Sequence, residues 1–544
     1  MTVQVTFLGG LGEVGRNCSV LEDDGRLAMI DCGLMFPTED MPGVDLVFPD
    51  WEWVVQRHED LELVVLTHGH EDHVGALGYF LRDVNVPVYG TPFSIELARA
   101  RVSEVGVEAD LRVVSDDQWV SHGSFRFQLI PVSHSVPQGC GVAFETSQGI
   151  VVHSGDLKLD PTPIDDRPTD LPTFAALGAE GIRLLMADST NAEQPGFVPS
   201  ERTVGPELLT IFESAPGRVI AACFSSHLHR VQQIIDVAIQ TGRYISLVGR
   251  SMERNVSIGT ELGLVDLPSD RVLPIEELLA LPEEEALLIS TGSQGEPFAA
   301  LSLMAAGRHR WVTLGPDDTV IISATPIPGN ETAVSKVISG LMRSGARVFH
   351  GRNAHVHVSG HARQDELRTF INVLRPRTFV PIHGEYRHLR THGEIAEEML
   401  VPEVIVCENG DTITLDGDGT LVERDAVAAG YVYLDGTMLG DVRTAVIRDR
   451  AHLADEGVVV VTVGFDLRTG DCVHGPNLDS HGLMDDPEPV LAKAAEAVEL
   501  ELRGAVSGGA DPVEVRRIIR QAAARVIKAE TGLRPVVLPV VLEV

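Results

Sequence analysis

Three histidines and an aspartate crowd into the segment Thr67-His68-Gly69-His70-Glu71-Asp72-His73. The apolar run Leu63–Leu66 before it predicts a buried strand, and a helix is predicted to start near Asp72. Alternate residues of an extended loop point the same way, so His68 and His70 can share one metal ion. Asp72 and His73 diverge at a helix start, which suits a second ion beside the first. Imidazole and carboxylate are ligands that Zn²⁺ and Mn²⁺ both accept.

Further possible ligands follow apolar strands elsewhere in the chain. They lie in Pro131-Val132-Ser133-His134, Val151-Val152-His153-Ser154-Gly155-Asp156 and Val380-Pro381-Ile382-His383. Each is a weak signal alone, but strand-end loops at one edge of a sandwich converge on one site. For the segment His68–His73, the alternative is a solvated polar loop without metal. We predict two divalent ions held by His68, His70, Asp72, His73, His134, Asp156 and His383, with Asp156 bridging them.

One glycine motif near the N-terminus has a different explanation. Gly10-Leu11-Gly12-Glu13-Val14-Gly15 matches the pattern of a dinucleotide-binding turn. Such a turn must lead into a helix, whose first N–H groups meet the pyrophosphate. The residues that follow, Asn17–Leu21, are typical of a strand instead. The sequence therefore argues against a dinucleotide site here.

The elements that position these residues change character along the chain. Short strands and turns dominate the first 160 residues, whereas strands alternate with helices from about Pro206, as in a mostly parallel α/β sheet. Because Asp156 and His383 must serve one cleft, the α/β region between them is predicted to be an insertion. The predicted boundaries are 1–205 and 351–415 for the two parts of the first domain, 206–350 for the inserted domain, 416–450 for a linker and 451–544 for a C-terminal assembly domain.

The C-terminal region has its own pattern. Val458–Val463 and the turn Arg468-Thr469-Gly470 predict a hairpin. Two helices are predicted at about 488–504 and 512–530, the second opened by an Asp511 cap and closed by Gly532. Both helices have apolar and charged faces, which fit packing inside this domain or across a dimer.

The composition of the chain limits the classes of protein to which it can belong. The 544 residues suffice for two to four domains. No apolar stretch is long enough to span a membrane, and no signal peptide is evident. The six cysteines are scattered, which disfavours a disulfide framework and fits a reducing cytoplasm. The net charge of −36 should repel nucleic acid at long range, although a cleft can be locally positive. Charge alone decides nothing here.

Strand ends in the α/β region suggest an anion site. Ser225-Ser226, Gly249-Arg250-Ser251 and Thr291-Gly292-Ser293 each run from a strand into a predicted helix, whose free N–H groups can bind phosphate. Arg230, Arg250 and the loop His355–His361 could complete a pocket facing the metals. The alternative is a set of ordinary turns, which are also rich in Gly and Ser.

A family resemblance connects these motifs. His68-x-His70-x-Asp72-His73 with His134, Asp156 and His383 resembles the metallo-β-lactamase superfamily. Asp188 in Ala187-Asp188-Ser189-Thr190-Asn191, His361 in Ser359-Gly360-His361-Ala362, and His383 resemble the three later motifs of its β-CASP branch. The layout is most similar to the bacterial ribonuclease J family from about residue 3 to 415, and the match is looser beyond. Gln138-Gly139-Cys140 departs from the family pattern.

The resemblance implies a fold and an activity. The expected fold is α/β: a metallo-β-lactamase αββα sandwich, an inserted β-CASP domain and a small C-terminal α+β domain. The expected activity is metal-dependent RNA hydrolysis in RNA maturation and decay, 5′-to-3′ from 5′-monophosphate ends and also internally. His361 would protonate the leaving oxygen or stabilise the phosphorane, while Asp188 would orient a ligand histidine. The expected RNA-phosphate residues are Ser226, His227, Arg230, His355, His357, Ser359, Gly360 and His361.

The sequence also leaves other classes of function to consider. A β-CASP nuclease acting on DNA is the nearest alternative, but such enzymes usually lack the histidine that His383 supplies. A 3′-end-processing nuclease would carry RNA-binding domains before the metal motif. A small-molecule hydrolase or an inactive scaffold would not need the inserted domain.

The resemblance also implies a cytoplasmic homodimer or homotetramer, with a helicase or another ribonuclease as possible partners. Zn²⁺ is expected, and the ligands suit Mn²⁺ equally.

Overall fold

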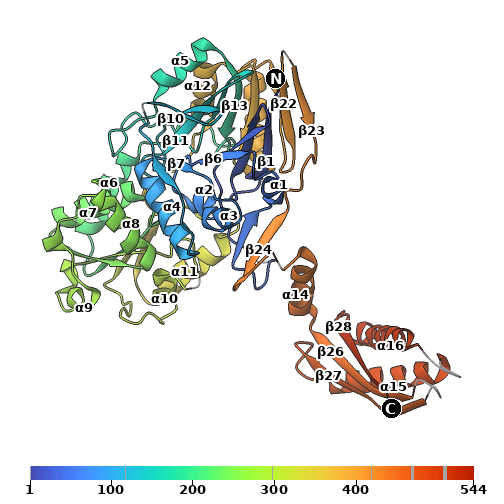
Figure 1. The fold of residues 1–544 in the computed structure, drawn as a ribbon. Helices are drawn as coiled ribbons and strands as arrows, with labels where there is room; N and C mark the ends of the chain where they lie inside the picture. Colours follow the sequence, from blue (N-terminus) through green and yellow to red (C-terminus); the bar gives the residue numbers. More distant parts are fainter. Residues whose placement is uncertain are drawn as a thin grey trace. The chain divides into compact units, whose positions relative to one another are not determined.

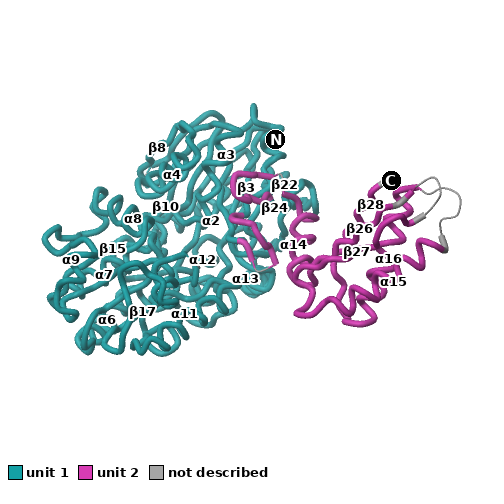
Figure 2. The backbone as a smooth tube through the Cα atoms, turned by 90° about the horizontal axis from the view of Figure 1, so that it is seen from below, with its two compact units in different colours: residues 1–36, 47–431 teal, residues 37–46, 432–544 magenta. Residues whose placement is uncertain are grey.

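The computed structural model describes residues 2–38, 40–116, 118–296, 298–417, 419–440, 442–466, 471–505 and 511–543 (Figure 1). The chain forms two compact units, drawn in two colours in Figure 2. One comprises Met1–Phe36 with Val47–Tyr431, and the other Pro37–Leu46 with Val432–Val544. Among the helices in these ranges, none has the length and apolar character needed to cross a bilayer.

Two mainly apolar sheets form the sandwich of the larger unit. The first has the order β23-β22-β1-β3-β4-β6-β7-β8, and the second β21-β19-β13-β12-β11-β10-β9. The strands of the first are β1 (Val3–Gly9), β3 (Cys18–Asp23), β4 (Arg26–Ile30), β6 (Leu61–Val65), β7 (Val88–Gly90), β8 (Leu111–Val113), β22 (Thr412–Asp416) and β23 (Gly419–Glu423). Those of the second are β9 (Trp119–His122), β10 (Phe125–Pro131), β11 (Cys140–Thr146), β12 (Gly149–His153), β13 (Ile182–Asp188), β19 (Thr378–Ile382) and β21 (Glu403–Val404).

Alternating side chains of the two sheets make one shared core. Phe7 and Leu63 of the first sheet belong to the same buried cluster as Phe127 and Val142 of the second. The opposite face of the second sheet packs against α5 (Leu171–Glu180), α12 (Gln364–Leu374) and α13 (Tyr386–Glu398). Beside the first sheet lie α2 (Glu71–Val74), α3 (Leu77–Asp83) and α4 (Pro92–Glu104). The arrangement is the expected αββα sandwich.

The inserted domain is built around a five-stranded parallel sheet in the order β15-β16-β14-β17-β18. One face is covered by α6, α7 and α8, and the other by α9, α10 and α11. The elements are α6 (Val204–Glu213), β14 (Val219–Ala222), α7 (Leu228–Gln240), β15 (Tyr244–Val248), α8 (Arg250–Glu261), α9 (Ile275–Leu278), β16 (Ala286–Ser290), α10 (Ala300–Ala305), β17 (Thr319–Ile322), α11 (Glu331–Arg343) and β18 (Arg347–His350).

The chain then returns to the sandwich. β19 pairs in parallel with β13, so that Asp188 lies opposite Ile382 although the inserted domain separates them in the sequence. This register brings the end of β19 beside the end of β13, and the Ser189 N–H donates to the His383 carbonyl at 3.2 Å. The pairing also explains why residues far apart in the sequence can share one site.

The glycine-rich N-terminal motif forms no dinucleotide turn. β2 (Leu11–Gly12) pairs with β20 (Gly384–Glu385), and β3 follows, as the residues after the motif predict. The glycines thus connect the N-terminal strand to the segment that follows His383. This role is structural.

The smaller unit contains the C-terminal sheet and its helices. The sheet order is β27-β26-β28, and α15 and α16 pack together on one of its faces. The residue ranges are β24 (Tyr431–Asp435), β25 (Met438–Leu439), α14 (Thr444–Glu456), β26 (Val458–Asp466), β27 (Asp471–His481), α15 (Glu488–Ala505), α16 (Pro512–Thr531) and β28 (Val536–Glu543). The stretch 416–450, predicted as a linker, thus holds β23, β24, β25 and the start of α14.

The predicted C-terminal hairpin and helices are present. β26 and β27 pair antiparallel, while the predicted turn Arg468-Thr469-Gly470 lies outside the described residues. The Asp511 carboxylate accepts the Val513 N–H at 3.0 Å, and Gly532 has the left-handed conformation (φ 80°) that ends α16. Both helices bury their apolar faces inside this unit.

Candidate metal centre

The segment His68–His73 follows β6 and is fixed by backbone contacts. The Cys32 N–H donates to the His73 carbonyl at 2.7 Å. Gly33 permits this approach, because a Cβ atom there would lie 1.6 Å from the Asp72 carbonyl oxygen. The backbone therefore sets the direction of these side chains.

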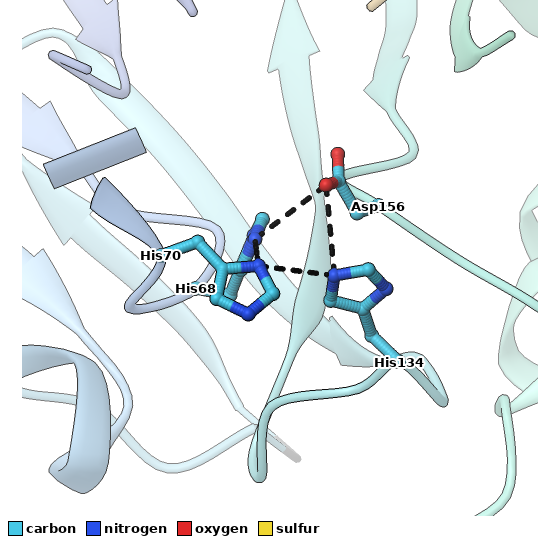
Figure 3. A group of neighbouring side chains, drawn as sticks. All are labelled: His68, His70, His134 and Asp156. Carbon is cyan, nitrogen blue, oxygen red and sulfur yellow. Dashed lines mark hydrogen bonds and ion pairs between the residues drawn. The ribbon is translucent and has the colours of Figure 1, made fainter. Parts of the chain in front are cut away.

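Four side chains converge in a first group, which Figure 3 shows. His70 Nδ1 lies 3.1 Å from His68 Nε2 and 3.2 Å from His134 Nε2. Asp156 Oδ2 is 3.6 Å from the same Nε2 atoms of His68 and His134. All four ligand atoms lie within 4.8 Å of one another. Three imidazoles and a carboxylate at this spacing match the donor set of a divalent metal ion.

A second group shares the same aspartate. His383 Nε2 lies 3.3 Å from Asp72 Oδ2 and 3.5 Å from Asp156 Oδ2. His73 Nε2 lies 3.4 Å from Asp156 Oδ2 and 3.6 Å from Asp72 Oδ2. Asp156 Oδ2 therefore faces both groups. The structure brings all seven predicted residues together, with the aspartate between the two sets.

The outer nitrogen atoms of three histidines are already occupied. Each donates its Nδ1–H to a fixed acceptor, namely His73 to Asp31 Oδ2 (2.8 Å), His134 to the Gly360 carbonyl (2.8 Å) and His383 to Thr190 Oγ1 (2.7 Å). These bonds favour the tautomer whose Nε2 lone pair points inward. Inward lone pairs facing two carboxylates repel one another unless a cation lies between them. The arrangement therefore fits divalent metal ions.

The electrostatics of the protein without metal agree with this fit. Burial lowers the pKa of His68 and His134 well below the usual value and that of His70 to about 4, so these rings are neutral near pH 7. Neutral imidazole is the form that binds metal. The Asp156 carboxylate acts in the opposite direction and raises the pKa of each ring, but burial has the larger effect.

The residues of the second group carry charge. Burial opposes ionisation of Asp72 and Asp156, but His73 and His383 hold the pKa of both carboxyl groups below the usual value. Burial likewise opposes protonation of His383, yet Asp156 and Asp72 raise its pKa to about 9. Without metal, His73 and His383 therefore each carry a second proton, on Nε2, which balances the carboxylates in place of a cation.

Asp188 and His361 form a third set at the edge of the centre. Asp188 Oδ2 accepts the His361 Nδ1–H at 2.8 Å, and this contact raises the pKa of His361 against the effect of burial. The side chain of His361 is 20% exposed, whereas that of Asp188 is buried. Asp188 was expected to orient a ligand histidine. It contacts His361 directly and reaches His383 through Thr190, whose hydroxyl donates to Asp188 Oδ1 at 2.8 Å.

Several residues expected to bind RNA phosphate lie beside the centre. Gly360 packs against His134, and a Cβ atom there would lie 2.7 Å from its Nδ1. Ser359 Oγ accepts from Asn191 Nδ2 at 2.8 Å and from the His361 N–H at 3.2 Å. This hydroxyl is therefore held next to His361.

The other expected phosphate residues differ in accessibility. Ser226 is partly exposed, and His355 is exposed with its Nε2 2.8 Å from Thr203 Oγ1. His227 is buried, while His357 is partly buried with a pKa of about 3, caused first by burial. Neither ring carries charge at neutral pH.

Arg230 departs from the expectation. Its guanidinium is fully buried and donates to both carboxylate oxygens of Glu201, at 2.7 and 2.9 Å. It also donates to Ser323 and to the Val356 carbonyl. The structure does not bring Arg230 to the surface, because the paired Glu201 holds it within the inserted domain.

Sequence reasoning missed the outer partners of the metal centre. Asp31 follows β4 as Asp156 follows β12, so the same strand-end signal could have found it. Thr190 lies in the motif of Asp188, but no spacing rule marks its contact with His383. The departing residue Gln138 has a local role: its amide oxygen accepts the Phe93 N–H at 2.8 Å, outside both ligand groups.

Models of known protein families match almost the whole chain. Residues 11–193 match the metallo-beta-lactamase superfamily, and residues 216–341 the beta-CASP domain of ribonuclease J. Residues 350–406 match the Zn-dependent metallo-hydrolase RNA specificity domain, and residues 445–544 the ribonuclease J C-terminal domain.

Curated relatives match over the full length. The chain is 42% identical to ribonuclease J of Mycolicibacterium smegmatis, over 100% of this chain and 97% of the relative. It is 38% identical to ribonuclease J of Thermus thermophilus, over 99% and 95%. A crystal structure of a protein of unknown function from Enterococcus faecalis superposes with a TM-score of 0.54 at 16% identity, over 76% of this chain and 100% of that one, which shows a shared fold.

Proposed function

The chain belongs to the ribonuclease J family and is a metal-dependent ribonuclease, and we propose that two ions act together in its cleft. We further propose that it degrades RNA from 5′-monophosphate ends in the 5′-to-3′ direction and also cuts internally. The relatives carry the ribonuclease J name, and the RNA specificity domain matches the segment that holds His361 and His383.

The observation that carries the two-ion proposal is the position of Asp156. One oxygen atom, Oδ2, lies within 3.6 Å of His68 and His134 and within 3.5 Å of His73 and His383. A carboxylate shared by two donor sets is the usual bridge of a dinuclear site. Zn²⁺ and Mn²⁺ both suit this donor set.

The chain's own residues would then divide the work. When bound, the ions would supply a hydroxide nucleophile at neutral pH and balance the charge that develops on phosphate. Asp188 holds His361 by Nδ1, which leaves Nε2 to face the substrate. We assign to His361 the proton for the leaving 3′ oxygen, with Asp188 as the positioning residue.

The 5′-end preference rests on the loop beside the centre. Ser359 and the backbone of Gly360 lie between Asn191 and His134, next to His361. A phosphate bound there would sit near the metal ligands, so that cleavage would release short products. Ser226, His227, His355 and His357 remain proposed members of this pocket, whereas Arg230 acts through the fold.

The test compares two substrates of one sequence. We expect Ser359→Ala to slow decay of 5′-monophosphate RNA by about tenfold, because one hydrogen bond to a charged group is lost. Internal cleavage of 5′-hydroxyl RNA should stay nearly unchanged. An equal loss on both substrates would contradict the pocket assignment. DNA of the same sequence is the control, and cleavage of DNA as fast as RNA would contradict the ribonuclease specificity.

The cofactor and the assembly need separate measurements. Activity after chelation and add-back of Zn²⁺ or Mn²⁺ tests which ion supports cleavage. We also propose a cytoplasmic homodimer or homotetramer that works with a helicase or another ribonuclease, which sedimentation and affinity purification from cells can test.

A further inference from the structure

A hollow of about 360 Å³ lies in the inserted domain beside its edge strand β15. Its walls come from the end of β15, from α8, α9 and α10 and from the loop after α10. Figure 1 labels these three helices. The lining includes Leu247, Gly249, Glu253, Arg308, Arg310 and Trp311. Of these, none belongs to the metal centre. The volume is in the range of small-ligand sites.

The hollow combines an exposed aromatic ring with free positive charge. Trp311 is 40% exposed, and Arg308 and Arg310 are both exposed. Among the residues that the structure describes, neither arginine forms an ion pair, whereas Arg218 and Arg230 of the same domain are held by carboxylates. Two arginines without acidic partners are notable in a chain of net charge −36.

The turn that carries these residues is held in shape. His309 Nδ1 accepts the backbone N–H groups of Trp311 (3.3 Å) and Val312 (3.2 Å). Val312 is buried in the core of the domain, which anchors the turn. The Arg310 guanidinium lies over the Trp311 ring, 4.5 Å from its centroid. The ring and the charge therefore form one stacked platform.

The edge of the sheet adds polar backbone groups. The Leu273 N–H donates to the Ile245 carbonyl on the outer side of β15. The backbone N–H and carbonyl groups of Leu247, two residues further on, point to the same side. Gly249 then begins α8 without a side-chain cap. Leu247 and Gly249 line the hollow, so polar backbone groups of the sheet edge contribute to its wall.

We propose that this hollow binds a nucleotide unit, with the base stacked on Trp311 and the phosphate on Arg308 and Arg310. Bases stack on aromatic rings and on arginine planes, and arginine binds phosphate bidentately. Glu253 repels phosphate, but it can accept an amino N–H of adenine, guanine or cytosine. This inference rests on the proposed function only in the choice of RNA as one source of the unit.

The unit can come from a free mononucleotide or from an RNA strand. For the free source, 8-azido-AMP is cross-linked to the full-length protein, and the labelled peptides are mapped by mass spectrometry. We expect label on the peptide around 303–318, protected by AMP but not by inorganic phosphate. The variant Arg308→Ala/Trp311→Ala should weaken AMP binding at this peptide by about tenfold or more. Met342→Ala/Arg343→Ala, an exposed pair on α11, is the matched control.

For the strand source, KM is measured on a 5-nucleotide and a 25-nucleotide RNA. If the unit belongs to the strand, the hollow variant raises KM for the longer RNA about tenfold or more and leaves the shorter one unchanged. The inference is overturned if the hollow variant matches the wild type both in AMP binding at this peptide and in KM for the longer RNA. It is also overturned if the label is confined to peptides of the metal centre. Binding of a polyglutamate peptide in place of AMP would overturn it too. Cleavage of the short RNA by the wild type reports the proposed function separately.

Discussion

The loops at the strand ends of the sandwich and those of the inserted domain differ in what their charged residues contact. In the sandwich, seven histidine and aspartate side chains face one another, and their outer atoms are held by neighbours such as Asp31. In the inserted domain, Arg230 faces Glu201 in complete burial, and the charge is cancelled within the fold. Both regions place polar residues at strand ends. In the sandwich these residues gather imidazoles and carboxylates around one point, a donor set that fits divalent cations.

The largest expected effect is in the sandwich. Asp156→Asn removes the charge that both ligand groups share while keeping the side-chain shape. We expect RNA cleavage to fall at least about 10⁴-fold, equivalent to more than about 5 kcal/mol in the barrier. Single-turnover cleavage and metal content measure the effect, with circular dichroism as the folding control. If Asp156→Asn kept both its metal and its activity, the charged residues of the sandwich would not differ in role from those of the inserted domain.

The inserted domain should respond in stability. Arg230→Met leaves the Glu201 carboxylate buried without its partner, and we expect the free energy of unfolding to fall by about 3–5 kcal/mol. The double variant Arg230→Met/Glu201→Gln should recover part of that loss, because it leaves no buried charge. Urea unfolding measures both. A stable Arg230→Met protein with weakened RNA binding would show instead that this arginine binds phosphate.

An intermediate effect is expected in the outer layer of the metal centre. Asp31 accepts from both His73 Nδ1 and the Thr67 N–H, each at 2.8 Å. Asp31→Asn should lower metal affinity by about 10–100-fold while the protein stays folded. Competition with a metal chelator measures the affinity, and Asp24→Asn in an exposed turn is the control. Equal affinities in the two variants would contradict a positioning role for Asp31.

The smallest effect concerns the surface of the same two regions. Arg254 of α8 pairs with Glu104 of α4 at 2.9 Å, and both side chains are substantially exposed. Because water and salt screen such pairs, Arg254→Ala should cost less than about 1 kcal/mol of unfolding free energy. Urea unfolding at low and high salt measures it. A loss of unfolding free energy as large as that of Arg230→Met would mean that burial does not explain why the two ion pairs differ in strength.

The sequence predicted that these seven His and Asp side chains converge, because their signal is local. Each ligand follows an apolar strand, and strands of one sheet end at a common edge. The spacing within His68–His73 also set the direction of four side chains. The pairing of β19 with β13 was not readable from spacing, but the need for His383 at the cleft required an insertion, and the structure has one.

The pairing of charges could not be predicted in the same way. Arg230 follows a strand-end loop as a phosphate ligand would, yet its partner Glu201 lies 29 residues earlier, on a different element. Thr190 likewise contacts His383 only because β19 pairs with β13, although the inserted domain separates the two strands in the sequence. Long-range contacts of this kind depend on tertiary packing, and no local pattern marks them.

The central claim is that Asp156 lies between two metal ions. Crystals of the full chain grown with Zn²⁺, and others grown with Mn²⁺, would allow anomalous difference maps at each metal's absorption edge. We predict two peaks about 3.5–4 Å apart, one beside His68, His70 and His134 and the other beside Asp72, His73 and His383. A map without peaks among these side chains, or with a single peak that does not contact Asp156, would contradict the account.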